Sequence, residues 1–152
     1  MAIFGGFNIS ASALTAQRLR MDIASANIAN TQTTRSTVNE NGEVVPYRRK
    51  MVALQSEGSD FRTYLHRARY GETKSSLQGV RVSRIVEDDE PFKLVFEPNH
   101  PDANEAGYVQ YPNVDPLKEM VDIISASRSY EANITALNGT KDMLLKTLEI
   151  GK

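Results

Sequence analysis

The stretch that decides the fold is residues 116–150 near the C-terminus, PLKEMVDIISASRSYEANITALNGTKDMLLKTLEI. Its one proline stands at the first position, where the missing amide proton costs a helix nothing. Side chains at alternating spacings of three and four residues form a ladder, of which seven of nine members are apolar: Met120, Ile123, Ser127, Tyr130, Ile134, Leu137, Lys141, Leu144 and Leu148. This ladder predicts one long helix with a seam of the coiled-coil type.

Two features modify that helix. Leu117, Val121 and Ile124 add a second apolar strip near its start. Gly139 stands inside the ladder, where glycine costs about 0.5–1 kcal/mol relative to alanine, so the sequence allows a bend there.

A shorter helix is predicted at the other end of the chain. Residues 9–31 lack glycine and proline and are rich in alanine, and Asn8 or Ser10 could cap them. Their ladder has five apolar members of seven: Phe7, Ser10, Leu14, Gln17, Met21, Ala24 and Ile28. At ~1.5 Å per residue this helix would be about 33 Å long and its partner about 50 Å, so the longer helix has apolar surface that the shorter one cannot cover.

The middle of the chain, residues 33–111, carries strand and turn signals. Strand candidates are residues 47–54, 80–86 and 92–96, and Asn41-Gly42 could close a tight turn. Residues 55–78 are polar and form either a surface loop or a partly disordered segment. We therefore expect an α+β fold: residues 1–32 and 112–152 as a terminal helical domain, and residues 33–111 as an inserted β-rich outer module.

Composition limits the function. The chain has 152 residues, a net charge of −1 and no cysteine, which argues for about one domain and against generic nucleic-acid binding, disulfides and thiolate metal sites. No stretch approaches the ~20 apolar residues of a membrane span, and the N-terminus lacks the pattern of a cleavable signal peptide.

Charge is uneven in the middle module. Residues 35–84 hold ten Lys/Arg and five Asp/Glu, whereas residues 85–112 hold one and seven. Opposed patches either pack head to tail between copies or are simply solvated. The run Arg48-Arg49-Lys50 is the best nucleic-acid candidate, and its alternatives are a solvent-facing strand or pairing with acidic neighbours.

No catalytic, cofactor-binding or metal-binding constellation is predicted. His66 and His100 lie far apart in the sequence and are interpreted as surface residues. The acidic run at residues 87–90 lacks the spacing of a calcium loop and is interpreted as a solvated turn. What remains distinctive is two helical termini around a small dipolar insert, which suggests assembly rather than catalysis.

Several motifs resemble the bacterial flagellar rod and hook proteins. Residues 26–33 (ANIANTQT) match their signature near the end of the first helix, and residues 107–114 (GYVQYPNV), 119–122 (EMVD), 125–133 (SASRSYEAN) and 141–151 (KDMLLKTLEIG) are similar to the proximal rod proteins among them. The family motif residues carried over are Asn27, Asn30, Thr33, Pro112, Asn113, Glu119, Met120, Arg128, Tyr130, Glu131 and Asn133.

The resemblance implies a structural subunit of the flagellar basal-body rod that is not an enzyme and needs no cofactor. It implies export through the flagellar type III apparatus and assembly in the periplasmic space with other copies and other rod proteins, without nucleic acid or membrane insertion. The terminal helices would line an inner tube around the export channel. The alternative is a soluble or secreted helical adaptor that binds a partner helix through the C-terminal ladder.

Two expectations about residues follow. The helix packing interface is predicted at Leu14, Met21, Ile28, Val121, Ile124, Tyr130, Ile134, Leu137, Leu144 and Leu148. Asn27 and Asn30 are expected near the helix end, where asparagine tolerates the left-handed conformation and can bond exposed carbonyls; otherwise they are two exposed helical asparagines.

Overall fold

The computed structural model describes residues 5–38, 42, 44–57, 65, 68–69 and 78–150. Most of the polar stretch 55–78, together with Asn41 and His66, lies outside the described residues, so the predictions made for them stay predictions.

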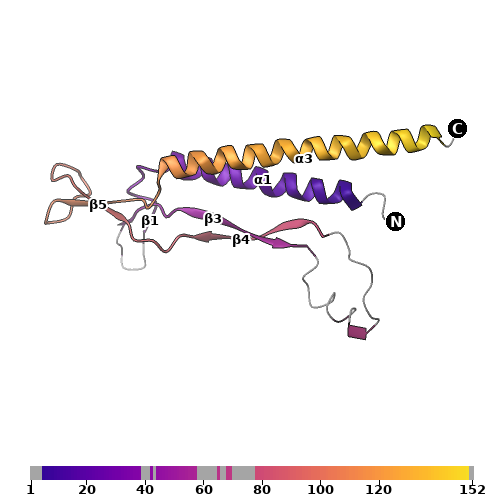
Figure 1. Ribbon diagram of the computed structural model, residues 1–152. Coiled ribbons are helices and arrows are strands. Elements are labelled where there is room, and N and C mark those ends of the chain that lie inside the picture. Colours follow the sequence, from indigo (N-terminus) through magenta and orange to yellow (C-terminus); the bar gives the residue numbers. More distant parts are fainter. Residues whose placement is uncertain are drawn as a thin grey trace. The chain divides into compact units, whose positions relative to one another are not determined.

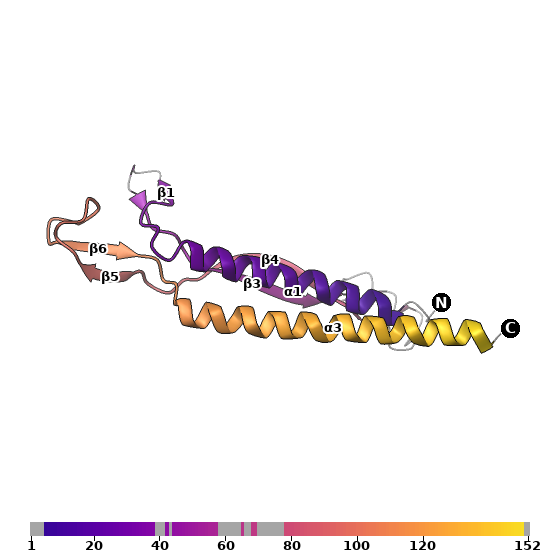
Figure 2. The ribbon, with the colours of Figure 1, turned by 90° about the horizontal axis from the view of Figure 1, so that it is seen from above.

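Two long helices dominate the described chain. Helix α1 spans Gly5–Ala29 and helix α3 spans Pro116–Ile150. They run side by side in opposite directions in both ribbon views (Figures 1 and 2). A Cβ added to Gly6 would lie 3.8 Å from Thr140 Oγ1, an ordinary van der Waals distance, which shows that the two helices pack against each other at that level. Helix α3 continues through Gly139 without a break.

The start of α1 corrects the expected capping. Asn8 and Ser10 lie inside the helix, which already includes Gly5 and Gly6, and so neither is its cap. The poor helix propensity of the glycines is overridden by their position beside α3, because packing contributes more to helix stability than intrinsic preference.

Six short strands form three two-stranded sheets in the described part of the chain. They are β1 (Thr37–Val38) with β2 (Val44–Val45), β3 (Lys50–Ser56) with β4 (Val80–Glu87), and β5 (Lys93–Phe96) with β6 (Tyr108–Tyr111). The first and third pairs are antiparallel. Gly42, beside the predicted turn, has a φ of +79°, which glycine adopts without strain.

The strands differ from the sequence prediction in two places. Strand β3 begins at Lys50 rather than Tyr47, because the Tyr47 amide donates to Thr33 O and the Arg49 amide donates to Asn113 Oδ1 instead of to a neighbouring strand. Strand β6 was not predicted, and it pairs with β5 from Lys93–Tyr111 to Phe96–Tyr108. Gly107 precedes it at a φ of +80°.

The chain divides into two compact units, and each contains part of both helices. One comprises Met1–Leu19, Val52–Arg84 and Ser125–Lys152, and the other Arg20–Met51 and Ile85–Ile124. Among the described residues the buried apolar side chains are few: Ala16, Ala24, Pro46, Tyr47, Val109, Pro112, Val114 and Ala126. The expected α+β fold with paired terminal helices is confirmed, and the division into a helical domain and an outer module stays a prediction.

Candidate assembly surface

The residues of α3 that face into the subunit follow a regular spacing, and we call this row the inward seam. Half of its members do not belong to the apolar ladder that the sequence predicted. Along the helix, one row of buried or half-buried side chains recurs at spacings of four and three: Glu119, Ile123, Ala126, Tyr130, Asn133, Leu137, Thr140 and Leu144. Asp122, Ser127 and Ser129, beside this row, are half-buried as well. The predicted ladder shares Ile123, Tyr130, Leu137 and Leu144 with this seam. Its other members lie one residue too late, and Met120, Ile134, Lys141 and Leu148 are exposed. The inward positions that the sequence analysis missed carry polar or small side chains. A search for large apolar residues does not select them.

The inward face of α1 explains the choice of those side chains. Its most buried residues are Ser10, Ala16, Ala24 and Asn27. Small side chains allow neighbouring segments to approach closely, and that leaves little room for large residues opposite. Leu14, Met21 and Ile28, predicted for the interface, are only half-buried.

The predicted interface residues therefore fall into two sets. Half-buried within the chain are Leu14, Met21, Ile28, Tyr130, Leu137 and Leu144. Exposed are Val121, Ile124, Ile134 and Leu148. The first set already packs inside the subunit, so the exposed set is the better candidate for contact with other molecules.

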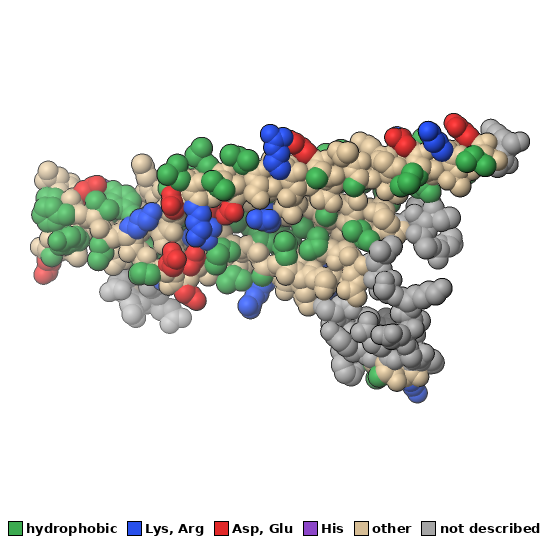
Figure 3. All heavy atoms as spheres, in the orientation of Figure 1, with side chains coloured by type: hydrophobic (Ala, Val, Ile, Leu, Met, Phe, Trp, Pro, Cys, Tyr) green, Lys and Arg blue, Asp and Glu red, His purple; other side chains and the backbone are tan. Residues whose placement is uncertain are grey.

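Exposed apolar side chains on α3 gather at its two ends. The start strip consists of Leu117, Met120, Val121 and Ile124, and the end strip of Met143, Leu145, Leu148 and Ile150. Exposed fractions of these eight residues run from 49% at Leu145 to 87% at Ile150. Figure 3 shows apolar side chains on the surface near both ends of this helix. Apolar patches of this kind mark sites of protein contact.

A buried polar cluster lies beside the start of α3, and all its members belong to the second compact unit. We define this Asn27 cluster as Asn27, Tyr47, Arg49, Asp88, Asn113 and Glu119. Asn27, which is 1% exposed, uses its whole amide group. Its Nδ2 donates to Lys50 O and Glu119 Oε2 at 2.9 Å each, and its Oδ1 accepts from the Lys50 amide and the Tyr47 hydroxyl at 3.0 Å each. Helix α1 is thereby bonded to the start of β3 and to α3.

Arg49 is the only cation in the cluster. Its Nε donates to Glu119 Oε1 at 2.6 Å, and its terminal nitrogens reach Asp88 Oδ2 at 3.2 Å and Asp122 Oδ2 at 3.5 Å. Glu119 is 1% exposed. An ionised carboxylate is buried at this depth only with charged and hydrogen-bonding partners, which Arg49 and Asn27 supply.

Asn113 joins a third segment to the cluster. Its Oδ1 accepts from the Arg49 amide at 2.9 Å, and its Nδ2 donates to Asp88 O and Glu90 O at 3.3 and 3.2 Å. The Asp88 amide returns a bond to Arg49 O at 2.8 Å. The residues before β3, after β4 and before α3 are thus held together, and every described buried side-chain nitrogen and oxygen has a partner.

The cluster shifts the ionisation of its members. Burial raises the pKa of Tyr47, and the charge of Glu119 adds to the effect. The backbone hydrogen bond from Glu90 and the guanidinium of Arg49 hold the pKa of Asp88 below its ordinary value. Burial alone would lower the pKa of Arg49, but its bonds to Glu119 and Asp88 outweigh burial and raise it. These shifts favour the charged forms of Arg49 and Asp88.

This geometry corrects the interpretation of the two charged runs. Arg49 is not a surface cation but the buried partner of Glu119, and Asp88 is its second partner rather than part of a solvated turn. Arg48 stacks 4.7 Å over the Phe92 ring and donates to Asp88 O. Of the basic run, Lys50 alone is exposed. The nucleic-acid reading therefore loses its best candidate, and the opposed patches are partly neutralised inside the subunit.

The motif residues are distributed over several places. Asn27, Asn113 and Glu119 all belong to the Asn27 cluster. Pro112, the residue before Asn113, is also buried. Asn30 donates to Ala26 O at 2.9 Å, as expected for an asparagine that bonds a carbonyl near the helix end. Its side-chain oxygen accepts from Thr33 Oγ1. The left-handed conformation is wrong, since no described residue other than glycine has a positive φ.

The remaining motif residues lie along α3. Arg128 and Glu131 form an exposed pair, Asn133 bonds Ser129 O of its own helix, Tyr130 is on the seam and Met120 is exposed. Sequence reasoning missed Tyr47, Arg49 and Asp88 as cluster members. The available signal was the pair of a basic run at residues 48–50 and an acidic run of similar length at residues 87–90.

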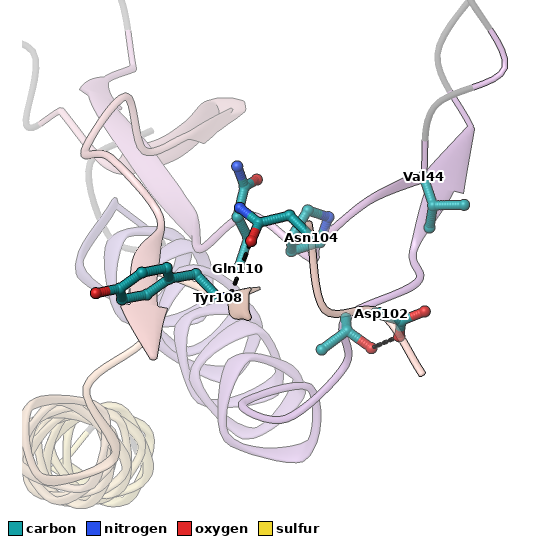
Figure 4. Close-up of a pocket in the computed structure, with 7 residues that line it drawn as sticks. Val44, Asp102, Asn104, Tyr108 and Gln110 are labelled. Carbon is teal, nitrogen blue, oxygen red and sulfur yellow. Dashed lines mark hydrogen bonds between the residues drawn. The ribbon is translucent and has the colours of Figure 1, made fainter. Parts of the chain in front are cut away.

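The third sheet is a second exposed apolar region. Leu94, Phe96 and Tyr108 on β5 and β6 are exposed, and the rings of Phe96 and Tyr108 meet edge to face at 5.3 Å. In the segment between β5 and β6, the Asp102 carboxylate accepts hydrogen bonds from Arg35 and from Thr34 Oγ1. A pocket beside this contact is lined in part by Val44, Asp102, Asn104, Tyr108 and Gln110, which Figure 4 labels.

Neither metal nor membrane chemistry is indicated for the residues that the structure describes. No group of three potential ligands gathers among them, and none of their helices is long and apolar enough to cross a membrane. His100, the described histidine of the two, accepts from the Asp102 amide.

Comparison with known proteins agrees with the motif resemblance. Residues 7–35 match the family described as flagella basal body rod protein, and residues 105–150 match the C-terminal region of the flagellar basal body rod FlgEFG proteins. The flagellar basal-body rod protein FlgC of Bacillus subtilis is 60% identical over 152 residues, covering all of both chains.

More distant relatives carry the same name and match over nearly their whole length. The FlgC of Escherichia coli O6:H1 is 41% identical over 152 residues, again covering all of both chains. That of Borreliella burgdorferi is 41% identical over 161 residues, covering 99% of this chain and 98% of its own. The alternative of a helical adaptor is not favoured. The motifs, the paired terminal helices and these full-length matches place the chain in the family of the flagellar basal-body rod protein FlgC.

Proposed function

We propose that the chain is a structural subunit of the proximal part of the flagellar rod, which polymerises through its terminal helices around the export channel. The start and end strips of α3 support this proposal, since apolar side chains that remain exposed in the single subunit gain stability when a neighbour covers them. The partners are other copies of this chain and other rod proteins. The chain performs no enzymatic reaction in this role.

The route to the assembly site is part of the same proposal. The subunit is made in the cytoplasm, passes the flagellar type III export apparatus, and joins the rod in the periplasmic space. A small core with few large buried side chains supports this route, because a chain that buries little apolar surface unfolds at low cost.

The single observation that carries the proposal is the exposure of the start strip on a helix that is anchored by the Asn27 cluster. A double variant, Val121→Asp with Ile124→Asp, places carboxylates in that strip without touching the seam. Lys118→Asp is the matched control, because it adds the same side chain at an exposed, non-apolar position of the same turns.

The test is complementation of a strain that lacks its own copy. We expect the double variant to be exported but absent from isolated basal bodies, and the Lys118→Asp chain to be present in them. Normal rods and motility with the double variant would show that the start strip is not an assembly contact.

A further inference from the structure

The seam between α1 and α3 is repetitive along its length. Its half-buried larger members on α3, Ile123, Tyr130, Leu137 and Leu144, recur every seven residues. A slip of α3 by one heptad would replace each of these by the next and keep an apolar side chain at nearly every level. The small residues of α1 add little selectivity, because alanine and serine fit against many side chains. Apolar packing alone therefore specifies the register of the helices weakly.

The polar positions of the seam do not tolerate the same slip. A one-heptad shift exchanges Glu119 for Ala126 opposite Asn27 and Arg49. Asn27 Nδ2 then loses the acceptor it now has at 2.9 Å, and Arg49 Nε loses the carboxylate oxygen at 2.6 Å. Both groups are buried, so the slipped register leaves a cation and an amide without partners at a large cost.

The cluster is held from its other sides as well. Asn27 is fixed to the backbone of Lys50 by two bonds, and the Arg49 amide is fixed to Asn113 just before α3. The acceptor for Arg49 and Asn27 therefore has to come from one level of α3. Glu119 is the residue at that level.

We propose that the Asn27 cluster is a registration device: it sets the axial position and rotation of α3 against α1, and contributes less to stability than to this choice. Buried polar groups act in this way in some helical assemblies, and their replacement by apolar side chains often costs little stability. Registration determines that Leu117, Met120, Val121 and Ile124 face outward. Only the use of this outward strip as a rod contact rests on the proposed function.

The test measures register in the purified full-length chain. The chain has no cysteine, so spin labels on Asp22→Cys and Lys118→Cys, both at exposed positions in the same compact unit, report one distance. We expect a single distance in the parent. In the triple apolar variant Asn27→Leu, Arg49→Met and Glu119→Leu, we expect helix content to be kept and a second distance, displaced by up to about 10 Å per heptad, to appear.

The matched control is Asn133→Leu. Asn133 is also a half-buried asparagine on the seam, but its Nδ2 bonds only Ser129 O of its own helix. We expect this variant to keep the single distance. A single parental distance in the triple variant would overturn the proposal.

A second variant decides the matter if the triple variant does not fold. Asn27→Asp keeps the oxygen that accepts from Lys50 and Tyr47, but places a carboxylate against Glu119. The other charged or titratable groups that act on this site are Arg20, Tyr47, Arg49, Glu87, Asp88, Lys118 and Asp122. Two adjacent carboxylates bind a proton more readily than one. We expect the second distance at pH 7.5 and the single parental distance again near pH 5. The parental distance alone at both pH values would contradict the proposal.

Assembly is measured separately. If the spectroscopic result holds and the triple variant still enters basal bodies normally, registration is correct and the role of the start strip in the rod is wrong.

Discussion

The first and last turns of α3 carry the same number of exposed apolar side chains, yet they are held very differently. In the first turns, Glu119 is buried and bonded to Asn27 and Arg49, while the start strip faces outward. In the last ten residues no side chain is buried and only Leu144 is half-buried. Exposure on an anchored helix indicates a preformed surface, whereas exposure on an unanchored one indicates a segment that packs only after assembly.

The largest effect is expected from breaking the anchor of the first turns. Glu119→Ala removes the closest carboxylate from the buried Arg49, and removal of one partner of a buried pair costs about 3–5 kcal/mol. We expect urea unfolding of the purified chain to show a loss of this size. Glu131→Ala, which breaks the exposed pair with Arg128, serves as control and should leave the midpoint unchanged. Equal midpoints for the two variants would mean that the first turns are not anchored.

Removal of the last turns should leave the Asn27 cluster folded but should prevent incorporation into the rod. Deletion of Lys141 to Lys152 takes away the end strip, whose apolar side chains are each worth roughly 1.5–3 kcal/mol when fully buried by a neighbour. We expect the shortened chain to keep the amide protection of the Asn27 cluster in hydrogen exchange, to be secreted, and to be missing from isolated basal bodies. Incorporation at the normal level would identify these turns as a dispensable tail.

Two isoleucines sharpen the same contrast between packing within and between subunits. Ile28 is half-buried in the chain, whereas Ile134 is 38% exposed. We expect Ile28→Asp to lower the free energy of unfolding by a few kcal/mol, because the carboxylate is partly desolvated, and to reduce assembly as a consequence. Ile134→Asp should lower the free energy of unfolding less than Ile28→Asp does, and should still impair assembly. Thermal unfolding and basal-body content of both variants provide the comparison.

The anchored region should also respond to acid. The pKa of Asp88 is lowered in the folded chain from its ordinary value of 3.8. A lowered carboxylate pKa stabilises the fold above the unfolded value, and that contribution is lost as the pH falls through the folded value. We therefore expect stability to decrease below about pH 4 and this decrease to be smaller in Asp88→Asn. Unfolding midpoints of the parent chain and of Asp88→Asn, determined between pH 7 and pH 3, measure this loss of stability. Identical pH profiles for the two would show that Asp88 does not cause it.

The smallest effect is expected at Gly139, between the two regions. A Cβ there would meet nothing within 4 Å, so Gly139→Ala should raise helix stability by about 0.5–1 kcal/mol. Circular dichroism of the purified chain measures the gain. If the stabilised chain fails to assemble, a neighbouring subunit approaches the helix at this position.

Part of the candidate surface was predictable from single positions. Ile123, Tyr130, Leu137 and Leu144 reach the seam because large apolar side chains at heptad spacing leave water together on one face. Val121 and Ile124 were predicted to contact other helices, and they remain exposed in the subunit. The polar half of the seam was not predictable in this way, because Glu119 and Asn133 become inward residues only through partners supplied elsewhere.

The charged runs show the limit most clearly. Arg49 lies between Arg48 and Lys50 in sequence, and nothing local distinguishes the three side chains. Its burial depends on Asn113, Glu119 and Asp88, which follow it by 39 to 70 residues. Spacing along the sequence does not predict ion pairs and hydrogen bonds between residues this far apart, because the fold decides which of them meet.

By itself the sequence determined that two helices of unequal length enclose a β-rich middle, because helix and strand periodicity depend on neighbours within a few residues. It also determined the family, through motifs read directly from adjacent positions. Tertiary structure alone decided which phase of the α3 ladder turns inward, that Arg49 is a buried partner and not a surface cation, and that the start of α3 is anchored while its end is not. These features depend on hydrogen bonds and ion pairs between segments far apart in the chain, whose energies exist only once those segments have been brought together.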